Sequence, residues 1–391
     1  MNTKAYPATW AQGDAVRAAA SRWQRRGLLT PAQRATIEAA HPVTYYRPNN
    51  WIRVLLFVVT LLGAGTAMAS ATITTAFELG PVAYALLTLI GHLAALELLI
   101  KKSRYYRSGV DNALLYGALL AWAFLIACLG RDTDPSALTD PALWRWLVPV
   151  LLALLAALVR YADPLVAATS FAAAFALLFN VLLQSALGRL LLPFGMMAAA
   201  GALLLALRQL PARDDYFYYR SAGLVLRTLG LAVFYLAGNY LVVREGNAQL
   251  LGGGGPSTQI PLAPLFYVFT AGIPLVYIGL ALRRHDRLLL TLGLLALAFS
   301  IFTLRNYRSL LPPEIAATVG GAVLLLGALA ALRYLRTPRH GLTAAADAEA
   351  RPYFNLESLV VAETAHAPAA PEPGFEFGGG HSGGGGADSS Y

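Results

Sequence analysis

Polar residues are rare within the apolar stretches of the sequence, and five of them are the first candidates for chemistry. They are His92, Glu97, Asp111, Asn112 and Arg227. A polar or ionisable side chain is costly inside a bilayer, so such residues commonly mark ion, proton or substrate pathways. We therefore treat these five residues as a candidate intramembrane polar site.

Each charged candidate also has a purely structural explanation. Glu97 precedes Lys101 by four residues, so the two can pair on one helical face. Asp111 opens an apolar segment, where the helix dipole favours a carboxylate. Arg227 can extend its side chain back to the membrane surface, and His92 can be neutral and hydrogen-bonded to a neighbouring helix.

A short internal repeat suggests how two of these residues could meet. Tyr105–Ser108 and Tyr218–Ser221 share the sequence Tyr-Tyr-Arg-Ser, and each precedes an apolar segment. Aligning the copies places Asp111 one turn from Arg227, which predicts an ion pair if the copies pack about a common axis. Anchoring of both copies at the membrane surface by tyrosine and arginine is the alternative.

No motif in the sequence names a reaction. There is no Walker Gly-Lys-Ser/Thr, no His-Glu-x-x-His and no Gly-x-Ser-x-Gly. The six histidines are scattered, and the single cysteine, Cys128, cannot form an internal disulfide or a cysteine-based zinc site. We therefore predict that the protein is not an enzyme and that it uses no cofactor or metal.

The elements that position the polar residues are apolar helices. Hydrophobic residues make up 57% of the chain and charged residues 13%, and the apolar runs are near 20 residues long, which predicts transmembrane helices. We predict an all-α, polytopic bundle of about ten spans. The predicted spans are 51–76, 81–100, 111–130, 142–159, 164–184, 190–207, 221–243, 263–282, 288–304 and 313–332.

The distribution of positive charge predicts the orientation. With the N-terminus inside, 23 of the 30 Lys and Arg residues fall on the inner side and six on the outer side, as the positive-inside rule requires. Both ends are therefore expected in the cytoplasm. The net charge of +9 reports this topology, and we expect lipid rather than nucleic acid as the partner of the basic loops.

Two regions outside the bundle, which is assigned to 51–336, complete the predicted domains. Residues 1–50 are expected to form a cytoplasmic helical hairpin, with Asp14 and Thr30 as helix caps and Gly27 in the turn. Residues 337–391 are rich in alanine, proline and glycine, which predicts a disordered cytoplasmic tail.

The N-terminal pattern resembles a known class of proteins. The segment Ser21-Arg22-Trp23-Gln24-Arg25-Arg26-Gly27-Leu28-Leu29-Thr30-Pro31-Ala32-Gln33, followed by about ten spans, is similar to bacterial predicted membrane proteins of unknown function. In that class a Trp-x-x-x-Gly-Leu-Ile/Leu hairpin precedes a hydrophobic bundle. The resemblance implies a multi-pass protein of the bacterial inner membrane and supplies no activity.

Two functions of different classes follow from these observations. The favoured interpretation is a non-enzymatic inner-membrane protein that anchors, senses or scaffolds, and that binds a cytoplasmic protein through residues 1–50 and 343–391. The alternative is a small-solute transporter or permease built on the repeat, because transporters commonly duplicate a helical unit and carry a polar site near the membrane midplane.

Overall fold

The computed structural model describes most of the chain up to residue 308. The described residues are 4–75, 80–130, 137–250, 259–260, 262–284 and 286–308, with a few single positions between 318 and 333. The predicted tail, 337–391, and most of the predicted tenth span, 313–332, lie outside the described residues. The described residues fall within one compact unit.

Two short helices precede the apolar part of the chain. The first, α1 (Ala8–Arg25), ends just before Gly27, whose φ of 71° suits glycine. The second, α2 (Pro31–Ala40), begins with Thr30 and Gln33 in a capping box. The expectation that Asp14 caps the first helix is wrong, because α1 begins six residues earlier, after Pro7. Asp14 instead forms an ion pair with Arg47.

Eight described helices are long and apolar enough to cross a membrane, which makes this chain a multi-pass membrane protein. No strand forms among the described residues. The eight helices are α4 (Pro81–Ser103), α5 (Val110–Leu129), α6 (Trp144–Tyr161), α7 (Pro164–Leu183), α8 (Ala186–Leu207), α9 (Tyr216–Gly238), α11 (Ala263–Arg284) and α12 (Arg287–Arg308).

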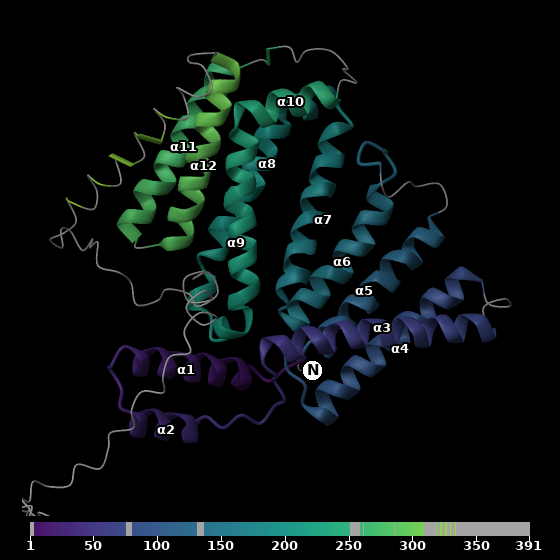
Figure 1. Ribbon diagram of the computed structural model, residues 1–391. Coiled ribbons are helices and arrows are strands. Elements are labelled where there is room, and N and C mark those ends of the chain that lie inside the picture. The colour runs from purple at the N-terminus through teal and green to yellow at the C-terminus, as the bar shows by residue number, and fades with distance from the viewer. Residues whose placement is uncertain are drawn as a thin grey trace, which may run out of the picture. The chain divides into compact units, whose positions relative to one another are not determined.

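The predicted first span corresponds to α3 (Asn50–Thr75), which has a different direction from most of its neighbours. In Figure 1 the helix directions change progressively from α9 through α7, α6 and α5 to α4, and α3 runs across them. Among the described helices α3 packs mainly on α5. Its described part exposes many large apolar side chains, including Trp51 at 86%.

The predicted span 221–243 is wrong at its end, because the helix breaks at Asn239. The Asn239 side chain accepts hydrogen bonds from the backbone of Leu241 and Val242 and so starts a new helix, α10 (Tyr240–Leu250). Residues 244–250, which follow the predicted span 221–243, are therefore helical. An asparagine within an apolar run is the sequence signal for this break.

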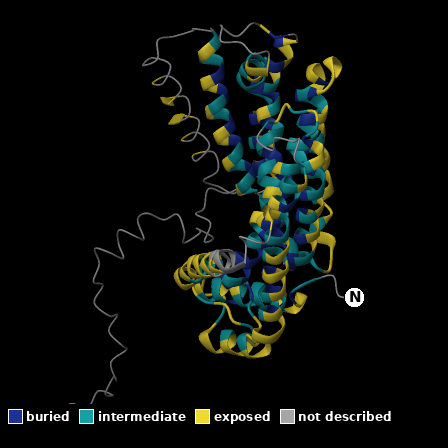
Figure 2. Cartoon of the chain, turned by 90° about the vertical axis from the view of Figure 1, so that its right-hand side faces the viewer, coloured by how far each residue is buried: buried dark blue, intermediate teal, exposed yellow. Residues whose placement is uncertain are grey.

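Helices that are adjacent in the sequence pack as pairs. The closest pairs are α4 with α5, α6 with α7, α8 with α9 and α11 with α12, and α9 also contacts α7 and α1. Figure 2 shows buried residues along the inner faces of the helices and exposed residues on their outer faces. Large exposed side chains such as Leu98, Leu120 and Leu152 are apolar, which suits contact with lipid.

Candidate functional site

The site is built around Asp111, at the start of α5. One carboxylate oxygen of Asp111 accepts hydrogen bonds from the backbone of Ser108 (2.9 Å) and Gly109 (3.2 Å) and from the Ser108 hydroxyl (3.0 Å). The other accepts from the backbone of Arg107 at 2.8 Å and from the Tyr6 hydroxyl at 2.6 Å. Asp111 is only 1% exposed, so these donors replace the water that a carboxylate needs.

The N-terminal segment before α1 supplies one of these donors. Tyr6 is 5% exposed and packs among the rings of Trp10, Tyr106 and Tyr161. Burial raises the pKa of Tyr6 well above its usual value, and the nearby Asp111 carboxylate adds to the effect. The phenol therefore stays protonated and donates to Asp111.

Two further contacts hold the same segment. The backbone N–H of Ala5 donates to the carbonyl of Arg160 at 2.8 Å, and the Lys4 ammonium lies 3.0 Å from the carboxylate of Asp215. These contacts join the N-terminal segment to α6 and to the start of α9. Lys4 and Tyr6 are not among the residues predicted from the sequence. The nearby local signal is Pro7, which marks the start of α1.

Asn112 takes part in a second group of contacts beside Asp111. Its amide donates to Asp163 at 2.6 Å, and its oxygen accepts from the Arg53 guanidinium at 3.3 Å. Asp163 caps α7 and also accepts from the Tyr116 hydroxyl at 2.9 Å. Asp163 is not among the predicted site residues, although an aspartate followed by a proline is a common start of a helix.

Glu97, near the end of α4, forms the third group. Its carboxylate lies 3.4 Å from the Lys101 ammonium, so the predicted pairing of these two residues is confirmed. Closer contacts come from α6, where Arg160 donates at 2.6 and 2.9 Å and the Tyr161 hydroxyl at 2.8 Å. Since the ring of Tyr161 lies 6.3 Å from that of Tyr6, this group is continuous with the Asp111 group.

These three groups lie at the end of the bundle where the N-terminal segment is held, and we call them the hairpin-end network. The network links the N-terminal segment with α3, α4, α5, α6 and α7. Its residues are Tyr6, Arg53, Glu97, Asp111, Asn112, Tyr116, Arg160, Tyr161 and Asp163.

His92 lies apart from this network. Its Nδ1 is 2.8 Å from the carbonyl of Thr88, one turn earlier in α4, so the expected hydrogen bond to a neighbouring helix is replaced by one within its own helix. The imidazole is 9% exposed. It packs against α5 at Gly117, where a Cβ atom would collide with the ring.

The predicted ion pair between Asp111 and Arg227 is wrong. Arg227 pairs with Asp286, which precedes α12, while Asp111 is bound by the N-terminal segment and its own loop. The repeat that suggested the pair is not a structural repeat. Tyr105–Ser108 is a non-helical link that includes Arg107 at a φ of 49°, whereas Tyr218–Ser221 lies within α9.

A second polar cluster lies at the far end of α9, around the break at Asn239. The Asn239 side chain is fully buried, and its amide donates hydrogen bonds to the hydroxyls of Tyr235 (3.0 Å) and Thr303 (3.2 Å). The buried hydroxyl of Thr270 accepts from the backbone of Tyr240 at 2.9 Å. The cluster joins the start of α10 to α11 and α12.

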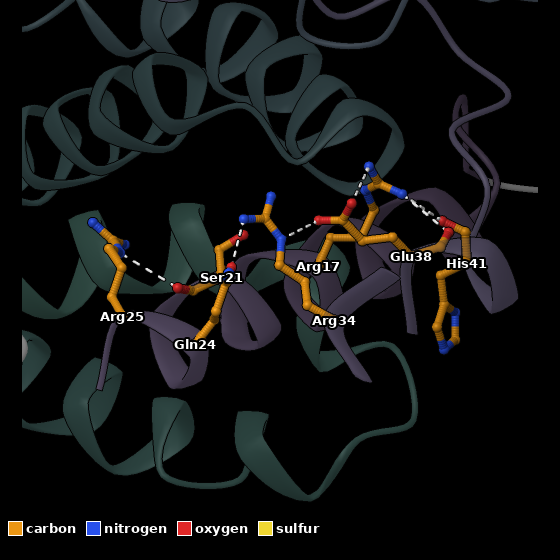
Figure 3. A network of polar contacts seen from close by, with 7 residues as sticks. All are labelled: Arg17, Ser21, Gln24, Arg25, Arg34, Glu38 and His41. Carbon is orange, nitrogen blue, oxygen red and sulfur yellow. Dashed lines mark hydrogen bonds and ion pairs between the residues drawn. The ribbon is translucent and has the colours of Figure 1, made fainter. Parts of the chain in front are cut away.

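The helical pair outside the bundle is held by its own ion pairs. Figure 3 shows Arg34 of α2 between Gln24 and Glu38, with donor to acceptor distances of 2.8 and 2.7 Å. The hydrogen bond from Arg34 lowers the pKa of Glu38. Arg17 of α1 donates to the carbonyls of Glu38 and His41, so α1, α2 and the segment that follows are tied together.

The chemistry of these clusters is that of attachment. Each carboxylate of the hairpin-end network accepts several hydrogen bonds, which stabilise its charge at a buried position in Asp111 and Asp163 and at a half-buried one in Glu97. Among the described residues, no group of three His, Cys, Asp or Glu side chains could hold a metal ion.

Comparison with protein-family models, with curated proteins and with solved structures gives no match.

Proposed function

We propose that this protein is a non-enzymatic, multi-pass protein of a bacterial inner membrane, with both ends in the cytoplasm, that anchors or senses. In this proposal α2 presents a surface to a cytoplasmic protein, α1 supports α2, and residues 343–391 assist. The positive-inside distribution of Lys and Arg supports the orientation. The N-terminal pattern that resembles bacterial membrane proteins supports the location.

One observation carries the proposal, namely that the two helices of the pair are used differently. The segment before α1 is fixed to the bundle through Tyr6 and Lys4. In contrast, α2 has no buried residue, and Ala32, Ala35, Thr36 and Ala39 are exposed. An exposed helix on a firmly attached support is a suitable arrangement for binding a protein, because little order is lost on binding.

The experiment is affinity purification from native membranes with surface variants of α2. Deletion of residues 1–50 would remove Tyr6 and Lys4 and so disturb the bundle. Substitutions at exposed positions of α2 are therefore preferable. We expect the double variant Ala35→Glu and Ala39→Glu to lose the cytoplasmic proteins that co-purify with the unmodified chain. The matched control is Ala18→Glu on α1, which is also exposed and should retain them.

The melting temperature of every variant is measured in parallel, so that loss of binding can be distinguished from loss of folding. Loss of the same cytoplasmic protein in the α2 variant alone supports the proposal. Equal recovery in all variants, or recovery of no cytoplasmic protein with the unmodified chain, contradicts it.

A transporter is the second candidate, and the break in α9 favours it. Transporters commonly use discontinuous helices whose ends bind the solute, and Asn239 interrupts α9 among buried hydroxyls. Solute uptake by vesicles containing the purified protein would be the test. If the protein is a transporter, Asn239→Ala and Thr303→Val should abolish uptake without loss of the folded protein. If it is a scaffold, the unmodified chain should show no uptake.

A further inference from the structure

A cavity of about 260 Å³ opens between α1 and the segment after α2. Its lining includes Thr9, Trp10, Gly13, Arg17, His41 and Tyr45. This volume is slightly below the range of sites for drug-sized ligands. The cavity therefore has room for a small molecule.

The lining of the cavity combines an aromatic wall with positive charge. Trp10 and Tyr45 form the wall, with ring centroids 5.3 Å apart. Arg17 supplies a guanidinium, and none of the lining residues is an aspartate or a glutamate. An aromatic ring with an anionic group matches this combination, because the ring can pack on the wall and the anion can approach Arg17.

The charge of Arg17 is only loosely balanced. Its Nη2 lies 3.7 Å from the Glu38 carboxylate, a long ion pair, and its Nη1 donates to two backbone carbonyls. In Figure 3 the His41 ring extends away from the Arg17 guanidinium. Burial, with a smaller effect of the Asp14 carboxylate, raises the pKa of Tyr45, so the phenol remains neutral. Asp14 is itself paired with Arg47.

The aromatic wall continues into the hairpin-end network. Tyr106 lies 5.0 Å from Tyr45, 5.8 Å from Trp10 and 5.1 Å from Tyr6, measured between ring centroids. Tyr6 donates to Asp111, and Arg107, next to Tyr106, does so through its backbone. A ligand in the cavity would therefore contact Trp10 and Tyr45, which pack on Tyr106, and Tyr106 packs on Tyr6.

We propose that this cavity is a binding site for a small aromatic carboxylate, whose ring packs on Trp10 and Tyr45 and whose carboxylate pairs with Arg17. The proposal deepens the sensing role proposed above by naming a class of ligand. Ligand binding is tested without any protein partner, so the ligand site and the proposed partner binding can be contradicted independently.

The test is ¹⁹F NMR of 4-fluorobenzoate with the full-length protein in detergent. Three variants separate the cavity from the micelle. Gly13→Leu fills the cavity, because a Cβ at this position meets open space, and Arg17→Gln removes the charge. Ala18→Leu is the matched control on the exposed surface of the same helix. Uncharged 4-fluorobenzyl alcohol reports partition into detergent.

We expect the unmodified chain and Ala18→Leu to broaden the 4-fluorobenzoate signal equally. Gly13→Leu should abolish the broadening, and Arg17→Gln should weaken binding by about tenfold, as for loss of a charge-assisted contact. The alcohol should respond equally to all four proteins. Broadening of 4-fluorobenzoate that survives in Gly13→Leu, or no broadening with the unmodified chain at millimolar probe, would overturn the proposal.

Discussion

At the scale of single residues, two aspartates at helix starts organise the contacts between distant parts of the chain. Asp111 collects donors from its own loop and from Tyr6, 105 residues earlier. Asp163 caps α7 and accepts from Asn112 and Tyr116 on α5. In both cases a carboxylate that the helix dipole already favours also binds another element.

The contact between Tyr6 and Asp111 should contribute measurably to stability. Tyr6→Phe keeps the buried ring and removes one donor from a carboxylate that is 1% exposed. We expect a loss of about 1.5–3 kcal/mol in the free energy of unfolding, the usual range for a hydrogen bond to a charged group. Unfolding in detergent would measure it, with Tyr46→Phe at a 46% exposed position as the control. Equal, small effects of both changes would show that the hydrogen bond is not important.

Acid should release the N-terminal segment through Asp215. Hydrogen bonds from Arg213 and from Lys4 lower the pKa of Asp215 from 3.8 to about 2. A carboxylate with a lowered pKa stabilises the folded state above its unfolded value, and this contribution is lost as the pH falls from about 4 to about 2. Between these values we expect the melting temperature to fall more steeply for the unmodified chain than for Asp215→Asn. Parallel curves would contradict this assignment.

At the scale of helices, the sequence predicts which segments are helical and how long they are. It does not predict as well where a helix breaks or in which direction it runs. Long apolar runs must form helices in lipid because every backbone group needs a partner within the segment. The break at Asn239 depends on Thr270 and Thr303, which come from α11 and α12. The direction of α3 depends on packing against α5, so it cannot be obtained from a local pattern. For the break in α9 the local signal is the asparagine itself, and the partners that bury it come from distant helices.

The repeat shows why a short match misleads. Tyr105–Ser108 and Tyr218–Ser221 differ in conformation, because the first follows Arg104 at a φ of 52° and the second continues a helix. The copies contact each other, as Arg107 Nη2 lies 3.5 Å from the Tyr218 carbonyl. Of the predicted polar site, Glu97, Asp111 and Asn112 belong to the hairpin-end network, and His92 and Arg227 lie elsewhere.

Packing of α4 on α5 should depend on a matched pair, His92 and Gly117. Gly117→Ala places a methyl group in the position of the imidazole, and overpacking of this kind costs about 1–3 kcal/mol. His92→Ala removes the ring, so the double variant should be more stable than Gly117→Ala alone. Gly91→Ala, where a Cβ meets open space, is the control. Strictly additive effects in an unfolding cycle would exclude a direct contact.

At the scale of the whole molecule, composition alone predicts a helical membrane protein, and long-range contacts decide how its parts are joined. Residues 4–6 carry no sequence motif. Yet Tyr6 contacts α5, Ala5 contacts α6 and Lys4 contacts the start of α9. A residue's partner 100 positions away leaves no local signal. This is why the hairpin-end network could be predicted only in part.

Removal of residues 1–7 eliminates the contacts of Lys4, Ala5 and Tyr6 but leaves α1 and α2 intact. The contacts that join the two helices, Arg34 with Gln24 and Arg17 with Glu38, should therefore persist. We expect α1 and α2 to detach from the bundle as a pair. Amide hydrogen exchange should become faster in α1, and trypsin should cleave sooner at the exposed residues Arg25 and Arg26. The control is removal of residues 374–391, which we expect to change neither the exchange of α1 nor the melting temperature. If the shortened chain retains slow exchange throughout α1, the contacts between α1 and α9 are sufficient, and the N-terminal segment is not the element that holds the two helices in place.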